Sequence, residues 1–138
     1  MADLKERIES EFEAVRNTLA AKPSTDRLAM LSVLELAGTA SLVHNFYNGI
    51  ENVLKQVFVA QGLSLPDGPA WHRDLLSASS DQGIISLTTA DTLKQYLAFR
   101  HFFSHAYALD LDPQRLEPLI HDAASTFAVF LQDIESRL

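Results

Sequence analysis

The chain has 138 residues, enough for one domain with a sizeable core, and its 47% hydrophobic and 21% charged content is that of a folded globular protein. The absence of cysteine excludes disulfides, thiolate metal sites and a cysteine nucleophile. The net charge of -7 opposes general nucleic-acid coating, which needs a basic surface, so RNA would need a local cationic cleft or a partner's help. The opening residues are charged, and no apolar run approaches the roughly 20 residues that span a bilayer. We therefore expect one domain over residues 1–138, cytoplasmic and without membrane contact.

In the first half of the chain, apolar residues recur every three or four positions, a pattern typical of helices. Residues 3–21 give the first amphipathic helix. Residues 26–61 contain no proline, but Gly38 costs about 1 kcal/mol relative to alanine inside a helix. The pattern there predicts either two helices or one long helix bent near Gly38. Residues 40–59 are apolar on more than one side, which predicts a central helix and a candidate contact with a second subunit.

The second half alternates loops and helices. Glycines and prolines mark residues 62–69 as a loop, and a short helix over residues 70–77 is expected to bury its tryptophan and two leucines. Residues 79–87 are interpreted as loop, because a single extended piece has no strand to pair with. A helix over residues 90–107 with a threonine N-cap at 88 or 89 follows, and an Asp-Pro start predicts a last helix over residues 112–136. The fold class is therefore an all-α bundle of four long helices plus one short helix.

Histidines are the first candidates for chemistry, at His44, His72, His101, His105 and His121. His101 and His105 are four residues apart, the helical spacing of two metal ligands, but no third ligand is apparent and we expect no metal. His44 and His121 are interpreted as boundary residues bonded to neighbours. His72 is ambiguous: it is either simply exposed beside Trp71, which anchors the short helix, or has a role that the sequence does not define. Walker, Rossmann and nucleophile-elbow patterns are absent.

Residues 100–107 bring together a guanidinium, an imidazole and a phenol, on Arg100, His105 and Tyr107. On one unbroken helix Arg100 and Tyr107 share a face, but His105 lies about 140° round from Arg100. Both can address one phosphate only if the helix loosens near Ser104 or if a second copy of the chain completes the site. The plainer interpretation is that Arg100 and His105 are structural and bond to carbonyls or acidic residues at a helix end.

The spacing Arg-x4-His-x-Tyr on a long helix of a small all-α protein resembles the HEPN superfamily, the higher eukaryotes and prokaryotes nucleotide-binding group. The tyrosine resembles the HepT-like toxin branch, which is paired with a minimal nucleotidyltransferase antitoxin. The resemblance spans most of the chain and extends to Leu42–Glu51, Trp71-His72 and Leu109–Leu111.

This resemblance implies a metal-independent endoribonuclease, with Arg100 and His105 as catalytic residues and no cofactor. In such enzymes the 2'-hydroxyl of RNA attacks the adjacent phosphate, so DNA cannot be cut. An imidazole can transfer the proton, and a guanidinium can stabilise charge on phosphate oxygens. Family sites form at the interface of a two-fold homodimer. The RNA, whether tRNA or mRNA, is not named by the sequence.

The resemblance also implies that the partner antitoxin adds AMP to Tyr107, which would block the cleft. His101 departs from the Asn or Asp that many members carry after the arginine, and it stays, with Ser104, a candidate supporting residue. The alternative function is a non-catalytic helical partner that presents nucleotides or a surface to a nucleotidyltransferase, and the acidic charge favours it.

Overall fold

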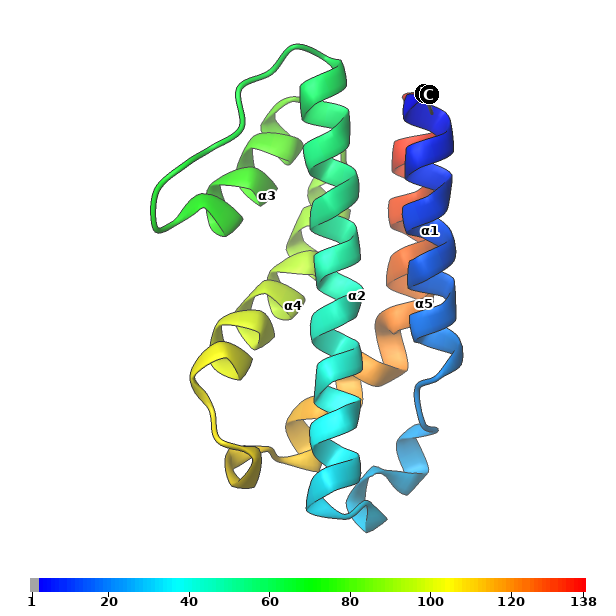
Figure 1. Cartoon of the computed structure of the whole chain (residues 1–138), viewed down its shortest axis with the longest axis vertical. Helices are drawn as coiled ribbons and strands as arrows, with labels where there is room; N and C mark the ends of the chain where they lie inside the picture. The colour runs from blue at the N-terminus through cyan, green and yellow to red at the C-terminus, as the bar shows by residue number, and fades with distance from the viewer. Residues whose placement is uncertain (1–2) are drawn as a thin grey trace.

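The computed structural model describes residues 3–138, with the backbone alone for Ala108. In this part of the chain five α-helices and two short 3-10 helices form the fold, and no strand is present. The elements are α1 (Leu4–Ala20), η1 (Thr25–Met30), α2 (Val33–Ala60), α3 (Trp71–Asp81), α4 (Leu87–His105), η2 (Ala108–Asp110) and α5 (Pro113–Glu135). Figure 1 shows α2 in the middle, with α1 and α5 on one side and α3 and α4 on the other. The predicted all-α bundle of four long helices and one short helix is confirmed.

The start of α2 differs from both alternatives that the sequence left open. The break falls at residues 31–32, between η1 and α2, and the helix runs through Gly38 without interruption. Ser32 caps α2: its Oγ accepts from Glu35 N at 3.1 Å, and Glu35 Oε1 accepts from Ser32 N at 2.9 Å. This capping box satisfies two N–H groups that would otherwise lack partners and lowers the pKa of the Glu35 carboxyl. The cap therefore decides where the helix begins, and Gly38 is tolerated.

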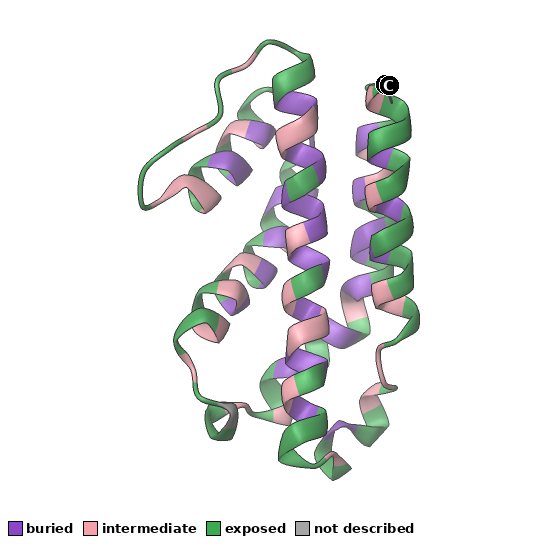
Figure 2. Ribbon diagram, viewed as in Figure 1, coloured by how far each residue is buried: buried purple, intermediate pink, exposed green. Residues whose placement is uncertain are grey.

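The core forms around α2, whose buried residues recur along its length (Figure 2), and α2 packs against α1 and α5 on one side and α3 and α4 on the other. Phe46 contacts Tyr96 and Phe127 edge to face, with ring centroids 5.1 and 6.5 Å apart. Gly49 brings α1 close, because a Cβ at this position would lie 2.5 Å from Val15 Cγ2. The expectation of a central helix that is apolar on more than one side is thus confirmed.

Two boundaries of α4 differ from the prediction. The N-cap is Ser86, not Thr88 or Thr89: Ser86 Oγ accepts from Thr89 N at 3.1 Å, and Asp133 of α5 accepts from Ser86 N at 3.0 Å. The helix ends at His105, and Ala106 is extended with ψ of 149°. The predicted helix to residue 107 is therefore wrong at its end.

The other predicted segments agree more closely with the structure. The helix α3 runs to Asp81, four residues beyond the predicted end, and α5 begins at Pro113 with Asp112 as its cap. Residues 84–85 lie in the predicted loop, although both isoleucine side chains are buried. Among the described helices, none has the length and apolar character needed to cross a membrane.

Candidate functional site

Arg100 and His105 lie on the last turns of α4, which stay helical as far as His105. Ser104 Oγ donates to Arg100 O at 2.9 Å, a bond within the helix, so the helix does not loosen at Ser104. Arg100 is half-buried and points toward α2, whereas His105 is exposed. On an ideal helix, side chains five residues apart lie about 140° round from each other, so a regular α4 directs Arg100 and His105 to different sides.

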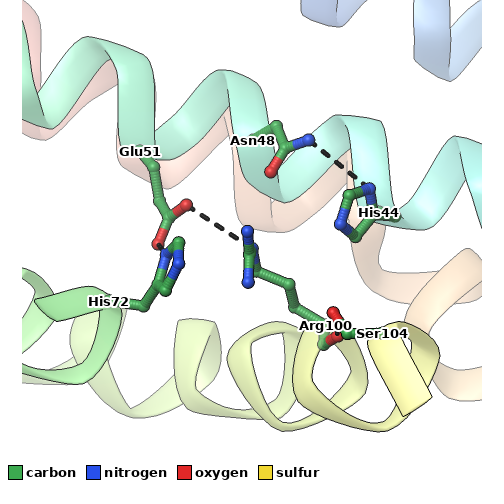
Figure 3. A network of polar contacts seen from close by, with 6 residues as sticks. All are labelled: His44, Asn48, Glu51, His72, Arg100 and Ser104. Carbon is green, nitrogen blue, oxygen red and sulfur yellow. Dashed lines mark hydrogen bonds and ion pairs between the residues drawn. The ribbon is translucent and has the colours of Figure 1, made fainter. Parts of the chain in front are cut away.

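A buried carboxylate holds Arg100. Glu51 of α2 is only 3% exposed, and its Oε1 lies 3.7 Å from Arg100 Nε. Its other oxygen, Oε2, lies 2.7 Å from His72 Nδ1 of α3. The interpretation of His72 as simply exposed is therefore wrong: its side chain is 21% exposed and bonded to Glu51. Figure 3 shows the histidine and the arginine converging on this one carboxylate from two helices.

The Arg100 guanidinium is not saturated by this contact. Its Nε is buried and, at 3.7 Å, too far from Glu51 for a hydrogen bond. Buried polar groups rarely go without a partner, and functional sites are among the places where they do. Arg100 therefore keeps unsatisfied donor capacity while its direction is set by charge attraction.

His44 and Asn48 of α2 lie on the opposite side of Arg100 from Glu51 (Figure 3). Asn48 Nδ2 lies 3.4 Å from His44 Nδ1, and the His44 ring contacts Phe103 at 5.1 Å between centroids. Burial, followed by the nearby Arg100 charge, lowers the pKa of His44. This favours the neutral ring, whose Nδ1 can accept from the Asn48 amide. His44 is thus the neighbour-bonded residue that the sequence predicts, but it also borders the site.

The exposed end of α4 carries a second group of residues. The His101 and His105 rings contact each other edge to face at 4.9 Å. They line a hollow of about 410 Å³ together with Phe102, Asp110 of η2 and Arg115 of α5. Among residues 3–138, no group of three or more His, Cys, Asp or Glu side chains could hold a metal ion. The chemistry available here is proton transfer and anion binding.

Tyr107 lies just beyond α4 and is 81% exposed, so its phenol is open to an approaching enzyme. Its backbone N donates to Asp110 Oδ2 at 2.9 Å, which ties the residue to η2. Because α4 ends at His105, Tyr107 does not continue the face of that helix on which Arg100 lies. His121, on α5, bonds to Asp122 at 2.9 Å, as predicted for a neighbour-bonded residue.

Neither Glu51 nor Arg115 is singled out by the sequence. Glu51 had a signal that could have found it, because it is the one acidic residue between Glu35 and Asp67. An isolated carboxylate in an apolar helix calls for a buried partner. Arg115 had no comparable signal, because it follows a proline start in a polar first turn.

A small all-α bundle whose penultimate long helix ends in Arg-x4-His, with a tyrosine two residues further on, has the architecture of a HEPN-type protein. The chain belongs to the HepT-like family: residues 38–137 match the family model described as HepT-like protein. The comparisons with curated proteins and with solved structures gave no match. Family membership indicates a toxin-related HEPN protein and points to a toxin–antitoxin module with a nucleotidyltransferase partner.

Proposed function

We propose that this protein is a metal-independent endoribonuclease toxin that uses Arg100 and His105. The observation that carries the proposal is the pairing, on the last turns of α4, of an arginine held by a buried carboxylate with an exposed histidine. Membership in the HepT-like family supports the same activity. Both residue types have roles in phosphodiester cleavage that need no cofactor.

The reaction begins when a base removes the proton of a ribose 2'-hydroxyl. The 2'-oxygen attacks the adjacent phosphorus, the bond to the 5'-oxygen breaks, and this oxygen takes up a proton. The products are a 2',3'-cyclic phosphate and a 5'-hydroxyl. His105 moves the protons, and Arg100 stabilises the negative charge on the phosphate oxygens. The terminal nitrogens of Arg100 donate the hydrogen bonds to the phosphate, since its Nε faces Glu51.

A two-fold dimer supplies the geometry that one protomer lacks. Arg100 and His105 point in different directions from a helix that stays regular, so a single copy does not present them to one phosphate. In a two-fold arrangement the same surface of each copy meets the other. Both copies of Arg100 and His105 then line one cleft. Such a cleft brings the guanidinium and the imidazole to one phosphate, which neither copy does alone.

Tyr107 is the proposed site of inactivation by the partner nucleotidyltransferase. Its phenol gives up a proton to solvent or to a base of the partner enzyme as the oxygen attacks the α-phosphorus of ATP. The bond to the β-phosphate oxygen breaks, and pyrophosphate leaves with AMP retained on the tyrosine. The 81% exposure of Tyr107 favours this role, because a modifying enzyme must reach the hydroxyl. Mass spectrometry after incubation with the active partner and ATP should find the adduct in the wild type and none in Tyr107→Phe. An adduct that persists in that variant would reject the site.

The nuclease activity is tested with pure protein, RNA and EDTA, followed by identification of the product ends. The wild type should cut and leave cyclic phosphates, and His105→Ala should lose cleavage. His121→Ala is the matched control, because His121 is also an exposed histidine of a helix but lies outside the site. Cleavage that requires added metal, or that survives His105→Ala unchanged, contradicts the proposal.

The second candidate is a non-catalytic helical partner of a nucleotidyltransferase. It is favoured by the net charge of -7 and by the divergence of Arg100 and His105 within one protomer. It requires a tight complex with that enzyme and no RNA cleavage at any protein concentration. The same RNA assay therefore separates the two functions.

A further inference from the structure

The Arg115 side chain extends from α5 to the end of α4, where its guanidinium stacks on an aromatic ring. Its guanidinium carbon lies 4.1 Å from the centroid of the Phe102 ring, within the range of a cation–π contact. The residue is exposed, and among residues 3–138 no carboxylate forms an ion pair with it. The charge is therefore fixed in position by stacking and not neutralised by a neighbour.

The hollow beside Arg115 gathers groups that bind anions. His101 and His105 contribute two exposed imidazoles, and each carries at least one N–H donor in any protonation state. The one carboxylate among the lining residues is Asp110, and its Oδ2 already accepts from the backbone N of Tyr107. Among the lining side chains, the cationic and N–H groups of Arg115, His101 and His105 face a single carboxylate. A phosphodiester supplies oxygens that can accept from these groups.

We infer that Arg115 is a phosphate-binding residue of the nuclease, which positions RNA at His105; this inference rests on the proposed function. Arg100 cannot fill this role in the same protomer, because its side chain points to Glu51 and not into the hollow. The arginine that shares a hollow with His105 is Arg115. It contacts a phosphate beside the one that is cut, so it contributes to binding rather than to the chemical step.

Binding to an RNA that cannot be cleaved tests the inference. The probe is a fluorescent single-stranded 2'-O-methyl oligonucleotide, whose attacking hydroxyl is blocked, and anisotropy gives Kd over a range of salt concentrations. The variants are Arg115→Ala, Arg115→Lys and Phe102→Leu. Arg16→Ala is the control, because it removes the same charge from an exposed arginine of α1. Circular dichroism checks that each variant is folded.

Loss of one phosphate contact should lower the salt slope of binding by about 0.7 and weaken Kd about five-fold at about 0.1 M salt. Arg115→Lys keeps the slope, and Phe102→Leu weakens Kd because the stacking platform is lost. These two variants decide the matter if Arg115→Ala does not fold. In the cleavage assay Arg115→Ala should raise KM with kcat unchanged.

The two proposals fail in different ways. If the wild type cleaves RNA but Arg115→Ala binds the oligonucleotide like Arg16→Ala, the inference is wrong and the nuclease stands. If the oligonucleotide binds through Arg115 and no RNA is cut, the nuclease is wrong and the anion site stands. If the wild type neither binds nor cuts, both are overturned.

Discussion

Replacing Glu51 by glutamine should destabilise the protein, because the buried carboxylate is hydrogen-bonded to His72 and attracts the charge of Arg100. Glu51 is 3% exposed, and its two partners, His72 and Arg100, keep only about a fifth of their side-chain surface open, at 21% and 23%. Removing one member of a buried pair costs about 3–5 kcal/mol, and a hydrogen bond to a charged group contributes about 1.5–3 kcal/mol. Glutamine has nearly the same volume as glutamate and keeps one acceptor oxygen, and the side chains of His72 and Arg100 stay partly exposed to water. The lower ends of the two energy ranges therefore apply. We expect a loss of about 2 kcal/mol.

Urea unfolding followed by circular dichroism measures this loss. With a slope of about 2 kcal/mol per molar urea for a domain of this size, the midpoint should fall by about 1 M. Glu13→Gln is the control, because Glu13 forms an exposed ion pair with Arg16 and should change stability by less than about 0.5 kcal/mol. If Glu51→Gln and the control have the same midpoint, the carboxylate does not hold the site and the argument for an oriented Arg100 fails. A double-mutant cycle with His72→Gln then tests the 2.7 Å bond alone, with a coupling of about 1 kcal/mol expected.

Gly49→Ala should destabilise the protein by about 1–3 kcal/mol in the same urea assay, since the new Cβ would lie 2.5 Å from Val15 Cγ2, and the Val15→Ala background should reduce this loss. The pKa of His44 is lowered by burial and by Arg100, so folding favours the neutral ring, and stability should fall as pH drops below about 6.5, where the unfolded ring takes up a proton. That loss should be absent from His44→Gln, and an identical pH profile for the two proteins contradicts it. Burial raises the pKa of Tyr96 to about 12, so stability should fall as pH rises above about 10. Burial also raises the pKa of Tyr47, so Tyr96→Phe should show a smaller fall rather than none, and a fall as large as that of the wild type contradicts the role of Tyr96.

The helices follow from the sequence, whereas some of their ends do not. Periodicity and the Asp-Pro start suffice for the five α-helices, because their apolar faces are set by local spacing. Ser86, Thr88 and Thr89 are all good N-caps by residue type. The choice among them is made by Asp133, which accepts from Ser86 N at 3.0 Å and from Thr89 Oγ1 at 2.7 Å. Asp133 lies more than forty residues away in the sequence, and no local pattern contains that contact.

The candidate site also combines residues that are visible in the local sequence with residues that only long-range packing brings together. The motif residues are close together in sequence, and their divergence on the helix follows from the helical repeat alone. Glu51 and His72 are brought together only when α3 packs on α2, and the bond between them spans 21 positions. Arg115 reaches the hollow because its side chain extends from α5 to the Phe102 ring of α4. The residues that perform the proposed chemistry are therefore visible in the sequence, and the residues that hold and complete the site are not.

The charge distribution explains how an acidic chain could attract RNA. The net charge of -7 describes the whole surface, whereas a phosphate responds to the potential in its cleft. Arg100 adds little to that potential, because the buried Glu51 carboxylate 3.7 Å away offsets its charge. The attraction must therefore come from cations without a carboxylate partner, and in the hollow beside His105 that cation is Arg115. Arg100 is thus suited to stabilise charge that develops during the reaction, and Arg115 to hold charge that the substrate already carries.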